Sequence, residues 1–251
     1  MRPIATTPRY AEIADDLRRQ ILDGTLAPGA RLPTLAELTN RYNVSERTAY
    51  EATRLLLNEG LINSKTGSGS FVRGRPTVVR LARSWYRDSA GRGSPWRADM
   101  AAQGRDGSWI SHSTPVKAAP AIAERLAIEP GDRAMRTEYT FTADGAPTYL
   151  STSWEPLALT NGTEIMLPED GEYAGAGVVD RFAAIGITID RNEEEILAHN
   201  LTIAEAEKLR LRPGISAVMI QRTYFAGDTP VETAAIVLPP HYRAVYQIPV
   251  G

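Results

Sequence analysis

Polar side chains that could read the bases of a DNA duplex are concentrated between residues 45 and 54. Arginine can pair with both major-groove acceptors of guanine, and glutamate can accept a hydrogen bond from the amino group of cytosine. A serine that precedes a helical run can cap the first turn, which would place this group at the start of a helix. The residues concerned are Ser45, Glu46, Arg47, Thr48, Tyr50 and Arg54.

A second group suited to phosphate contacts follows at residues 65–68. Lys65 supplies a positive charge, and Gly67 has no Cβ and so lets backbone N–H groups approach a polyanion. The group lies between two short apolar stretches, which predicts a hairpin. Its residues are Lys65, Thr66, Gly67 and Ser68. Three more candidates for contacts with the same partner are Arg9, Arg31 and Thr34.

The elements that would position these groups follow from the spacing of apolar residues. Helical spacing predicts helices over 10–21, 34–42 and 45–59, and two short strands should follow at 61–64 and 70–72. Two short helices followed by a basic hairpin have the layout of a winged helix-turn-helix, which inserts its second helix into the major groove of DNA. On these patterns alone, a three-helix packing or dimerisation module stays open as an alternative.

Composition excludes several other classes of function. The chain has 251 residues and no cysteine, so disulfides, thiolate chemistry and cysteine-ligated zinc are excluded. The three histidines lack ligand spacing and no phosphate-binding glycine loop occurs, so we expect neither a metal nor a cofactor. No apolar run approaches the ~20 residues of a membrane helix, and no export signal is recognisable. We therefore expect a cytoplasmic protein without membrane contact.

Charge and composition divide the chain into three parts. Residues 1–75 hold eleven Lys and Arg against eight Asp and Glu, whereas the rest is net acidic. This asymmetry predicts a polyanion partner at the N-terminal end only. Residues 76–110 are rich in Arg, Gly and Pro and predict a linker. Residues 111–251 then form the second domain.

The second domain contains an internal repeat. A shift of 83 residues aligns Ala121–Leu126 with Ala204–Leu209, and Pro130-Gly131 with Pro213-Gly214, without a gap. Each copy reads as a helix, a Pro-Gly turn and two strands, so the sequence predicts an αββ unit used twice. Two such units sharing a sheet would form one α+β domain, and clefts between related halves are common ligand positions.

The N-terminal residues resemble the DNA-binding domain of GntR-family bacterial transcription regulators. The resemblance is carried by Leu26-Ala-Pro-Gly29, Arg31-Leu32-Pro33, Tyr42-Asn-Val44-Ser45, Glu59-Gly60-Leu61-Ile62 and Gly67-Ser-Gly69-Ser70-Phe71-Val72. Glu46 and Tyr50 stand where these proteins usually carry arginine, so the resemblance implies DNA binding with an altered operator sequence.

The C-terminal residues are similar to the UTRA ligand-sensing domain, whose fold is that of chorismate lyase. The similarity is carried by Pro130-Gly131, Asp144-Gly145-Ala-Pro147, Pro213-Gly214, Arg222-Thr-Tyr224 and Pro230-Val-Glu232. The two resemblances together indicate the HutC subfamily. They imply an α+β protein with an N-terminal winged helix-turn-helix and a mixed α/β domain of chorismate-lyase-like fold that contains the αββ repeat.

The resemblance implies a repressor that binds an inverted-repeat operator in double-stranded DNA as a homodimer and is released by a small-molecule effector. The positions that would hold the effector are Arg136, Glu138, Ser151, Arg222, Tyr224, Glu232 and Tyr242. Tyr139 and Phe141 stand where phosphosugar sensors of this type carry paired arginines. A flatter and less anionic effector is therefore expected.

Two other functions stay open on the sequence. One is a repressor of plasmid or phage type that needs no effector and is controlled by its concentration or by a protein partner. The other is an enzyme of the chorismate-lyase type. The DNA-binding head argues against the enzyme, so we expect no catalytic activity.

Overall fold

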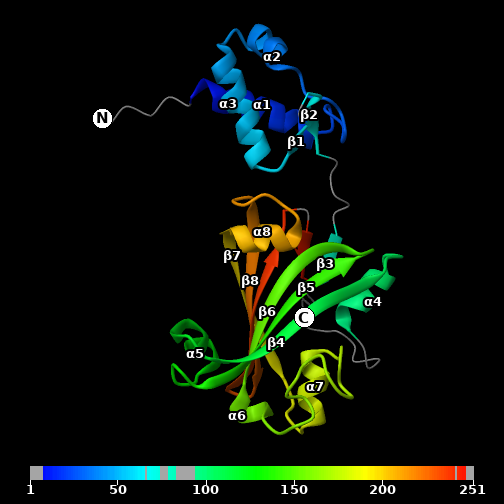
Figure 1. Ribbon diagram of the computed structural model, residues 1–251, viewed down its shortest axis with the longest axis vertical. Coiled ribbons are helices and arrows are strands. Elements are labelled where there is room, and N and C mark those ends of the chain that lie inside the picture. Colours follow the sequence, from blue (N-terminus) through cyan, green and yellow to red (C-terminus); the bar gives the residue numbers. More distant parts are fainter. Residues whose placement is uncertain (1–7, 66, 74–78, 83–93, 241, 247–251) are drawn as a thin grey trace, which may run out of the picture. The chain divides into compact units, whose positions relative to one another are not determined.

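The computed structural model describes residues 8–65, 67–73, 79–82, 94–240 and 242–246 (Figure 1). The chain forms two compact units, Met1–Val78 and Val79–Gly251. Thr66, which the sequence predicts at the hairpin tip, lies outside the described residues. Within the described part of the chain, no helix is both long and apolar enough to span a membrane.

The N-terminal unit consists of three helices and a hairpin. They are α1 (Arg9–Leu22), α2 (Leu35–Tyr42), α3 (Glu46–Asn58), β1 (Ile62–Lys65) and β2 (Gly69–Val72). Apolar residues at helical spacing give each helix one inward face, and these faces meet in a single core. Fully buried members include Ile13, Leu17, Leu38, Ala52 and Leu56. The predicted winged helix-turn-helix is confirmed.

Side-chain caps fix the points where α2 and α3 begin. The Glu37 carboxylate accepts from the Thr34 backbone N–H at 2.7 Å, and Thr34 Oγ1 accepts from the Glu37 N–H at 3.3 Å, which is a capping box. Asn43 ends α2 in the left-handed conformation with φ 49°. Ser45 Oγ then accepts from the Thr48 N–H at 3.2 Å and starts α3. The turn between the two helices is thus set by local chemistry.

The C-terminal unit is built on a six-stranded antiparallel sheet in the order β4-β5-β6-β9-β8-β7. Its strands are β4 (Gly107–Lys117), β5 (Arg133–Ala143), β6 (Ala146–Pro156), β7 (Arg191–Asn200), β8 (Ser216–Ala226) and β9 (Thr229–Leu238). A separate parallel pair joins β3 (Val79–Ala82) to β10 (Tyr242–Val245). The mixed α/β fold predicted for this part is confirmed.

The αββ repeat is visible in matching details of the two copies. Helix α5 (Pro120–Leu126) precedes β5 and β6, and α8 (Ile203–Leu209) precedes β8 and β9. Each helix ends in a non-glycine residue with a left-handed backbone, Ala127 in one copy and Arg210 in the other. These two residues are 83 positions apart, the shift found in the sequence. The copies meet at the centre of the sheet, where β6 pairs with β9.

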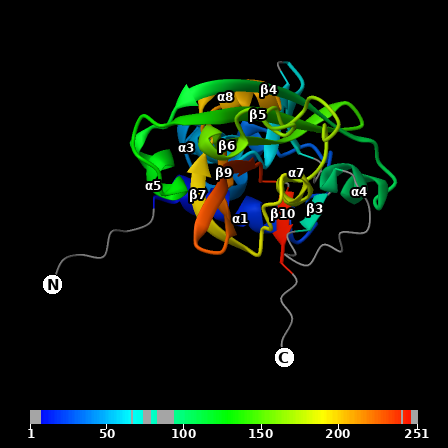
Figure 2. The same ribbon diagram turned by 90° about the horizontal axis from the view of Figure 1, so that it is seen from below.

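Strand register assigns each sheet residue to one of two faces. Thr137, Ser153, Ala234 and Arg222 are successive partners across β5, β6, β9 and β8, so they share one face. We call it the α7 face, because α7 (Val178–Ala184) packs there, next to the short helix α6 (Leu157–Thr160). The opposite face, here the α8 face, packs Leu150 and Val237 against α8. Figure 2 shows α5 on the other side of the sheet from α4 and α7.

Regular structure begins inside the segment that the sequence predicts as a linker, residues 76–110. Helix α4 (Pro95–Ala101) and the start of β4 lie within it, and the boundary between the two units falls at Val78. Trp96 of α4 is 3% exposed and donates its indole N–H to the carbonyls of Ser108 and Thr142. Residues 94–110 are therefore part of the C-terminal unit.

Candidate DNA interface and effector site

Helix α3 presents a stripe of polar side chains to solvent. Glu46, Arg47, Tyr50 and Arg54 are exposed, and at 3.6 residues per turn they fall within about 100° of the helix circumference. The buried residues of α3 lie on the opposite side and are Ala49, Ala52 and Leu56. The stripe contains four of the residues that the sequence predicts to contact DNA, and their side chains can form hydrogen bonds to base edges.

Arg47 is the side chain in this stripe with a guanidinium available to a ligand. Arg54 is paired with Glu51 at 3.0 Å, and Arg9 on α1 is paired with Glu12 at 2.6 Å. Among the described residues Arg47 has no ion-pair partner. Bidentate pairing with guanine therefore requires no internal interaction of Arg47 to be broken.

Three predicted DNA-contacting residues also hold the helix-turn-helix together. Ser45 and Thr48 cap α3 and have their hydroxyl oxygens 2.8 Å apart. The Thr34 hydroxyl donates to Glu37 at 2.8 Å, and the hydrogen bonds from Thr34 lower the pKa of the Glu37 carboxyl. These hydroxyls keep lone pairs or a rotatable proton for DNA, but their first role is to position the exposed stripe.

Arg31 lies against the hairpin rather than on the recognition helix. Its backbone bridges to Phe71 of β2, and it lines a groove together with Pro33, Thr34 and Arg41. Gly69 has φ +100°, and a Cβ on Gly69 would lie 3.1 Å from Arg31 Nε. The absence of that carbon leaves room for the guanidinium to rest along the hairpin. Gly67 and Ser68 at the tip are exposed, and the Lys65 backbone ends β1.

The predicted effector residues fall on two faces of the sheet. Ser151, Arg222, Tyr224 and Glu232 lie on the α7 face. Tyr242 comes from β10 and packs there against Trp96 and Tyr149, and its burial raises its pKa to about 12. Register brings four of the seven predicted residues to this face, and packing brings Tyr242 to the same side.

Arg136 and Glu138 lie on the α8 face instead. Their side chains form an ion pair at 2.8 Å, and Lys208 of α8 donates to Glu138 at 3.2 Å. All three are half-exposed or exposed. Side chains on opposite faces of a sheet cannot hold one small molecule, so the structure does not place Arg136 and Glu138 with the other five predicted residues.

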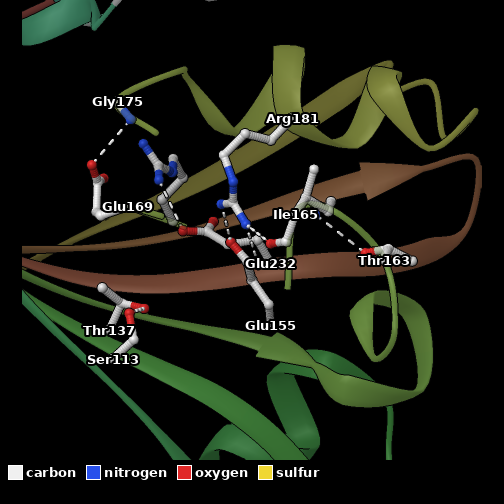
Figure 3. A network of polar contacts seen from close by, with 10 residues as sticks. Ser113, Thr137, Glu155, Thr163, Ile165, Glu169, Gly175, Arg181 and Glu232 are labelled. Atoms are coloured by element: carbon white, nitrogen blue, oxygen red, sulfur yellow. Dashed lines mark hydrogen bonds and ion pairs between the residues drawn. The ribbon is translucent and has the colours of Figure 1, made fainter. Parts of the chain in front are cut away.

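A buried ion pair on the α7 face was not foreseen from the sequence. Arg181 of α7 donates to both carboxylate oxygens of Glu155, at 2.7 and 3.0 Å, and to the Ile165 carbonyl at 2.5 Å (Figure 3). The side chains of Arg181 and Glu155 are 2% and 1% exposed, respectively. Bidentate geometry and the third hydrogen bond compensate for the cost of removing these charges from water.

Arg222 and Glu232 form a second pair beside the first. Arg222 donates to Glu232 Oε1 at 3.0 Å, and its guanidinium lies 4.4 Å from the centre of the Tyr224 ring. Burial raises the pKa of Glu232, the nearby Glu155 charge adds to this, and the Arg222 charge opposes it. We refer to Glu155, Arg181, Arg222 and Glu232 as the buried charge network.

Three polar atoms of the buried charge network have no hydrogen-bond partner among the residues that the structure describes. They are Glu232 Oε2, Arg181 Nε and Arg222 Nε. Buried polar atoms are almost always satisfied in folded proteins, so such a cluster calls for a water or a ligand. The network is therefore a place where a small polar molecule would gain hydrogen bonds that the protein alone does not supply.

Glu169 adds a third carboxylate on this side of the sheet. It accepts from the Gly175 N–H at 3.1 Å. Burial raises the pKa of Glu169, whereas the nearby Tyr139 hydroxyl, the Trp109 indole and the Gly175 N–H oppose the rise. Tyr139 in turn stacks on Phe141, with ring centres 5.4 Å apart, so an aromatic surface adjoins the polar groups.

The acidic side chains on this face act as hydrogen-bond acceptors. Glu155 is held by Arg181, one oxygen of Glu232 by Arg222, and Glu169 by the Gly175 N–H. In the described part of the chain, no group of three or more His, Cys, Asp or Glu side chains could hold a metal ion.

Known proteins match both units. A family model of bacterial regulatory proteins, gntR family, matches residues 9–72, and a UTRA domain model matches residues 102–242. The HTH-type transcriptional regulator SCO4628 of Streptomyces coelicolor is 30% identical over 91% of this chain and 87% of its own length. The mannosyl-D-glycerate transport/metabolism system repressor MngR of Escherichia coli is 28% identical over 76% of this chain and 74% of its own.

A solved structure supports the same assignment. A crystal structure described as that of a GntR-family transcriptional regulator aligns with a TM-score of 0.77 and 46% identity, covering 98% of this chain and 99% of the other. The family models together span most of the chain. The chain therefore belongs to the GntR family of bacterial transcription regulators, carries the DNA-binding head and UTRA domain that characterise the HutC subfamily, and is a DNA-binding regulator rather than an enzyme.

Proposed function

We propose that this chain is a repressor that binds an inverted-repeat operator as a homodimer and releases it when a small-molecule effector binds at the buried charge network. The observation that carries the effector site is the cluster of three buried polar atoms without partners, Glu232 Oε2, Arg181 Nε and Arg222 Nε. MngR is named a repressor, which supports repression for this related chain.

Release requires the effector to distinguish two states of the protein. A ligand shifts an equilibrium only by its difference in affinity for the two states. Arg181 and Glu155 tie α7 to β6, and Arg222 and Glu232 tie β8 to β9. A ligand inserted among these pairs would therefore act on helix and sheet together, which gives it a means of favouring one arrangement of the domain.

The proposed DNA binding predicts that an Arg47→Ala variant loses affinity for the operator but not for random DNA. Removing a guanidinium that pairs with a guanine should weaken specific binding by about 1–3 kcal/mol and leave binding to random DNA almost unchanged. Fluorescence anisotropy with operator and scrambled duplexes at one salt concentration measures both. Arg19→Ala, which removes an equal charge from the exposed surface of α1, is the matched control. An equal loss on both duplexes would remove Arg47 from base readout.

The proposed homodimer predicts the symmetry and spacing of the operator. Two recognition helices related by a two-fold axis should read half-sites about 34 Å apart, one helical turn, in opposite orientations. Selection of the full chain on a randomised DNA pool, followed by footprinting, gives the sequence. Analytical ultracentrifugation of the complex gives the number of chains. Recovery of one asymmetric half-site, or of one chain on each duplex, would contradict the proposal.

A further inference from the structure

The charges on the α7 face indicate what kind of molecule this site can hold. We propose that the effector is a small organic cation, a compound whose protonated nitrogen is bound by Glu232, and not a phosphate ester. This inference rests on the proposed function, because it assigns a ligand class to the same site.

The charged side chains on this side of the sheet include one more carboxylate than guanidinium, because half-exposed Glu169 adds to the two ion pairs. Three carboxylates, Glu155, Glu169 and Glu232, lie on this side of the sheet with two guanidiniums, Arg181 and Arg222. An added anion would increase the imbalance in a region of low dielectric constant, where like charges repel most strongly. An added cation would balance it.

Both guanidiniums already pair with a carboxylate, although the Nε–H group of each has no acceptor among the described residues. Arg181 uses its two terminal nitrogens on Glu155 and on the Ile165 carbonyl, and Arg222 is held by Glu232 and by the ring of Tyr224. Arginine binds a phosphate most strongly by bidentate donation from two of its nitrogens. A phosphate would therefore have to displace a buried glutamate from its arginine and leave that carboxylate without compensation.

The unpartnered oxygen of Glu232 identifies the group that is missing. Glu232 is 0% exposed, Oε1 accepts from Arg222, and Oε2 accepts from no donor. An acceptor buried in this way is satisfied only by a donor, and a charged donor forms the stronger hydrogen bond to a carboxylate. A molecule bound at Glu232 Oε2 therefore brings an N–H, and its positive charge offsets the additional carboxylate. The Nε–H groups of Arg181 and Arg222 need acceptors, which water or a polar substituent of the same molecule can supply.

The remaining surroundings suit an apolar or aromatic body on the same molecule. Between the charged pairs and Tyr139, the α7 face carries the small residues Ser151, Ser153 and Ala234. Tyr139 and Phe141 stack in parallel there, and aromatic faces attract cations as well as rings. These side chains offer contacts to both the cationic nitrogen and the ring of such a molecule.

A panel of matched triplets tests the ligand class on the full-length protein. Each triplet shares one ring and differs in the group it carries, as in benzylamine, benzyl alcohol and benzyl phosphate. Thermal shift followed by calorimetric titration should show amines binding about tenfold or more tightly than their alcohol and phosphate counterparts, because a hydrogen bond between charged groups exceeds a neutral one. Preference for phosphates across the panel, or no binding by any amine, would overturn the proposal.

A conservative variant locates the binding. Glu232→Gln keeps the size of the side chain and removes its charge, so amine affinity should fall about tenfold. Glu193→Gln, at an exposed position on β7, is the matched control and should bind amines like the wild type. Unchanged amine binding by a folded Glu232→Gln protein would overturn the assignment. Should that variant not fold, the comparison of triplets on the wild type still decides the ligand class.

A third measurement separates this inference from the function on which it rests. Operator binding is followed by anisotropy while the amine that binds best is added. Release of DNA supports both proposals. Amine binding without release keeps the ligand class and removes the effector-gated repressor, whereas release by phosphates alone keeps the repressor and removes the cation.

Discussion

Replacing Arg181 by methionine is expected to lower the free energy of unfolding of the C-terminal unit by about 3–5 kcal/mol. The change removes both donors of Glu155, whose side chain is 1% exposed, and leaves a buried carboxylate without a partner. Urea denaturation followed by tryptophan fluorescence measures the change, because Trp96, Trp109 and Trp154 lie in this unit and the N-terminal unit contains no tryptophan.

Glu155, the partner of Arg181, supplies the control for this prediction. A double variant, Arg181→Met with Glu155→Leu, removes both charges and should recover most of the lost stability, since an apolar pair of similar volume is often as stable as a buried ion pair. Arg191→Met removes an exposed partner of Glu193 and should change stability by less than about 1 kcal/mol. If Arg181→Met behaved like Arg191→Met, the buried pair would not be a structural requirement.

Replacing Trp96 by alanine should cost about 3–5 kcal/mol in the same unit. The indole is 3% exposed, donates to two backbone carbonyls and packs edge-on against Tyr149 with ring centres 5.1 Å apart. Its loss creates a cavity and leaves acceptors unsatisfied. Thermal unfolding followed by circular dichroism gives the change without depending on the fluorophore that is removed.

Trp96→Phe separates the two contributions to this effect. Phenylalanine keeps most of the packing against Tyr149 and loses only the indole N–H, so it should cost markedly less than alanine. The result also tests the extent of the linker. If α4 were only a connecting segment, neither substitution at Trp96 would change stability by more than about 0.5 kcal/mol.

The N-terminal unit could be predicted in detail because its signals are local. Thr34 and Ser45 are helix caps that act within three residues, and Asn43 has the left-handed conformation that ends a helix. The exposed stripe around Arg47 follows directly from helix periodicity once those caps are placed. Local rules therefore give both the fold and the surface of this unit.

The site in the C-terminal unit could be predicted only in part, because it depends on which faces of different strands coincide. Alternation shows that Arg136 and Glu138 share a face, and that Arg222 and Tyr224 do, but not that these faces are opposite. That relation depends on how β5 and β8 are connected through β6 and β9. Alternation within one strand carries no information about how strands pair.

The buried pair of Arg181 and Glu155 has a weaker signal in the sequence, which predicts one of its two members. Arg181 interrupts an otherwise mostly apolar helix, Val178–Ala184, and a charge in such a place requires a partner. The sequence does not say which acid supplies it, because Glu155 lies on a strand 26 residues earlier and reaches Arg181 only through tertiary packing.

The pairing of β6 with β9 at the centre of the sheet also affects the order in which the protein folds. Ser153 pairs with Ala234, so the sheet cannot be completed until most of the chain is available. Contacts between distant segments form slowly because a long loop must close first, whereas the three helices of the head make mostly near-sequence contacts. On the ribosome the head emerges and can fold first. The part that binds DNA would thus be complete in each new molecule before the part that is proposed to control it.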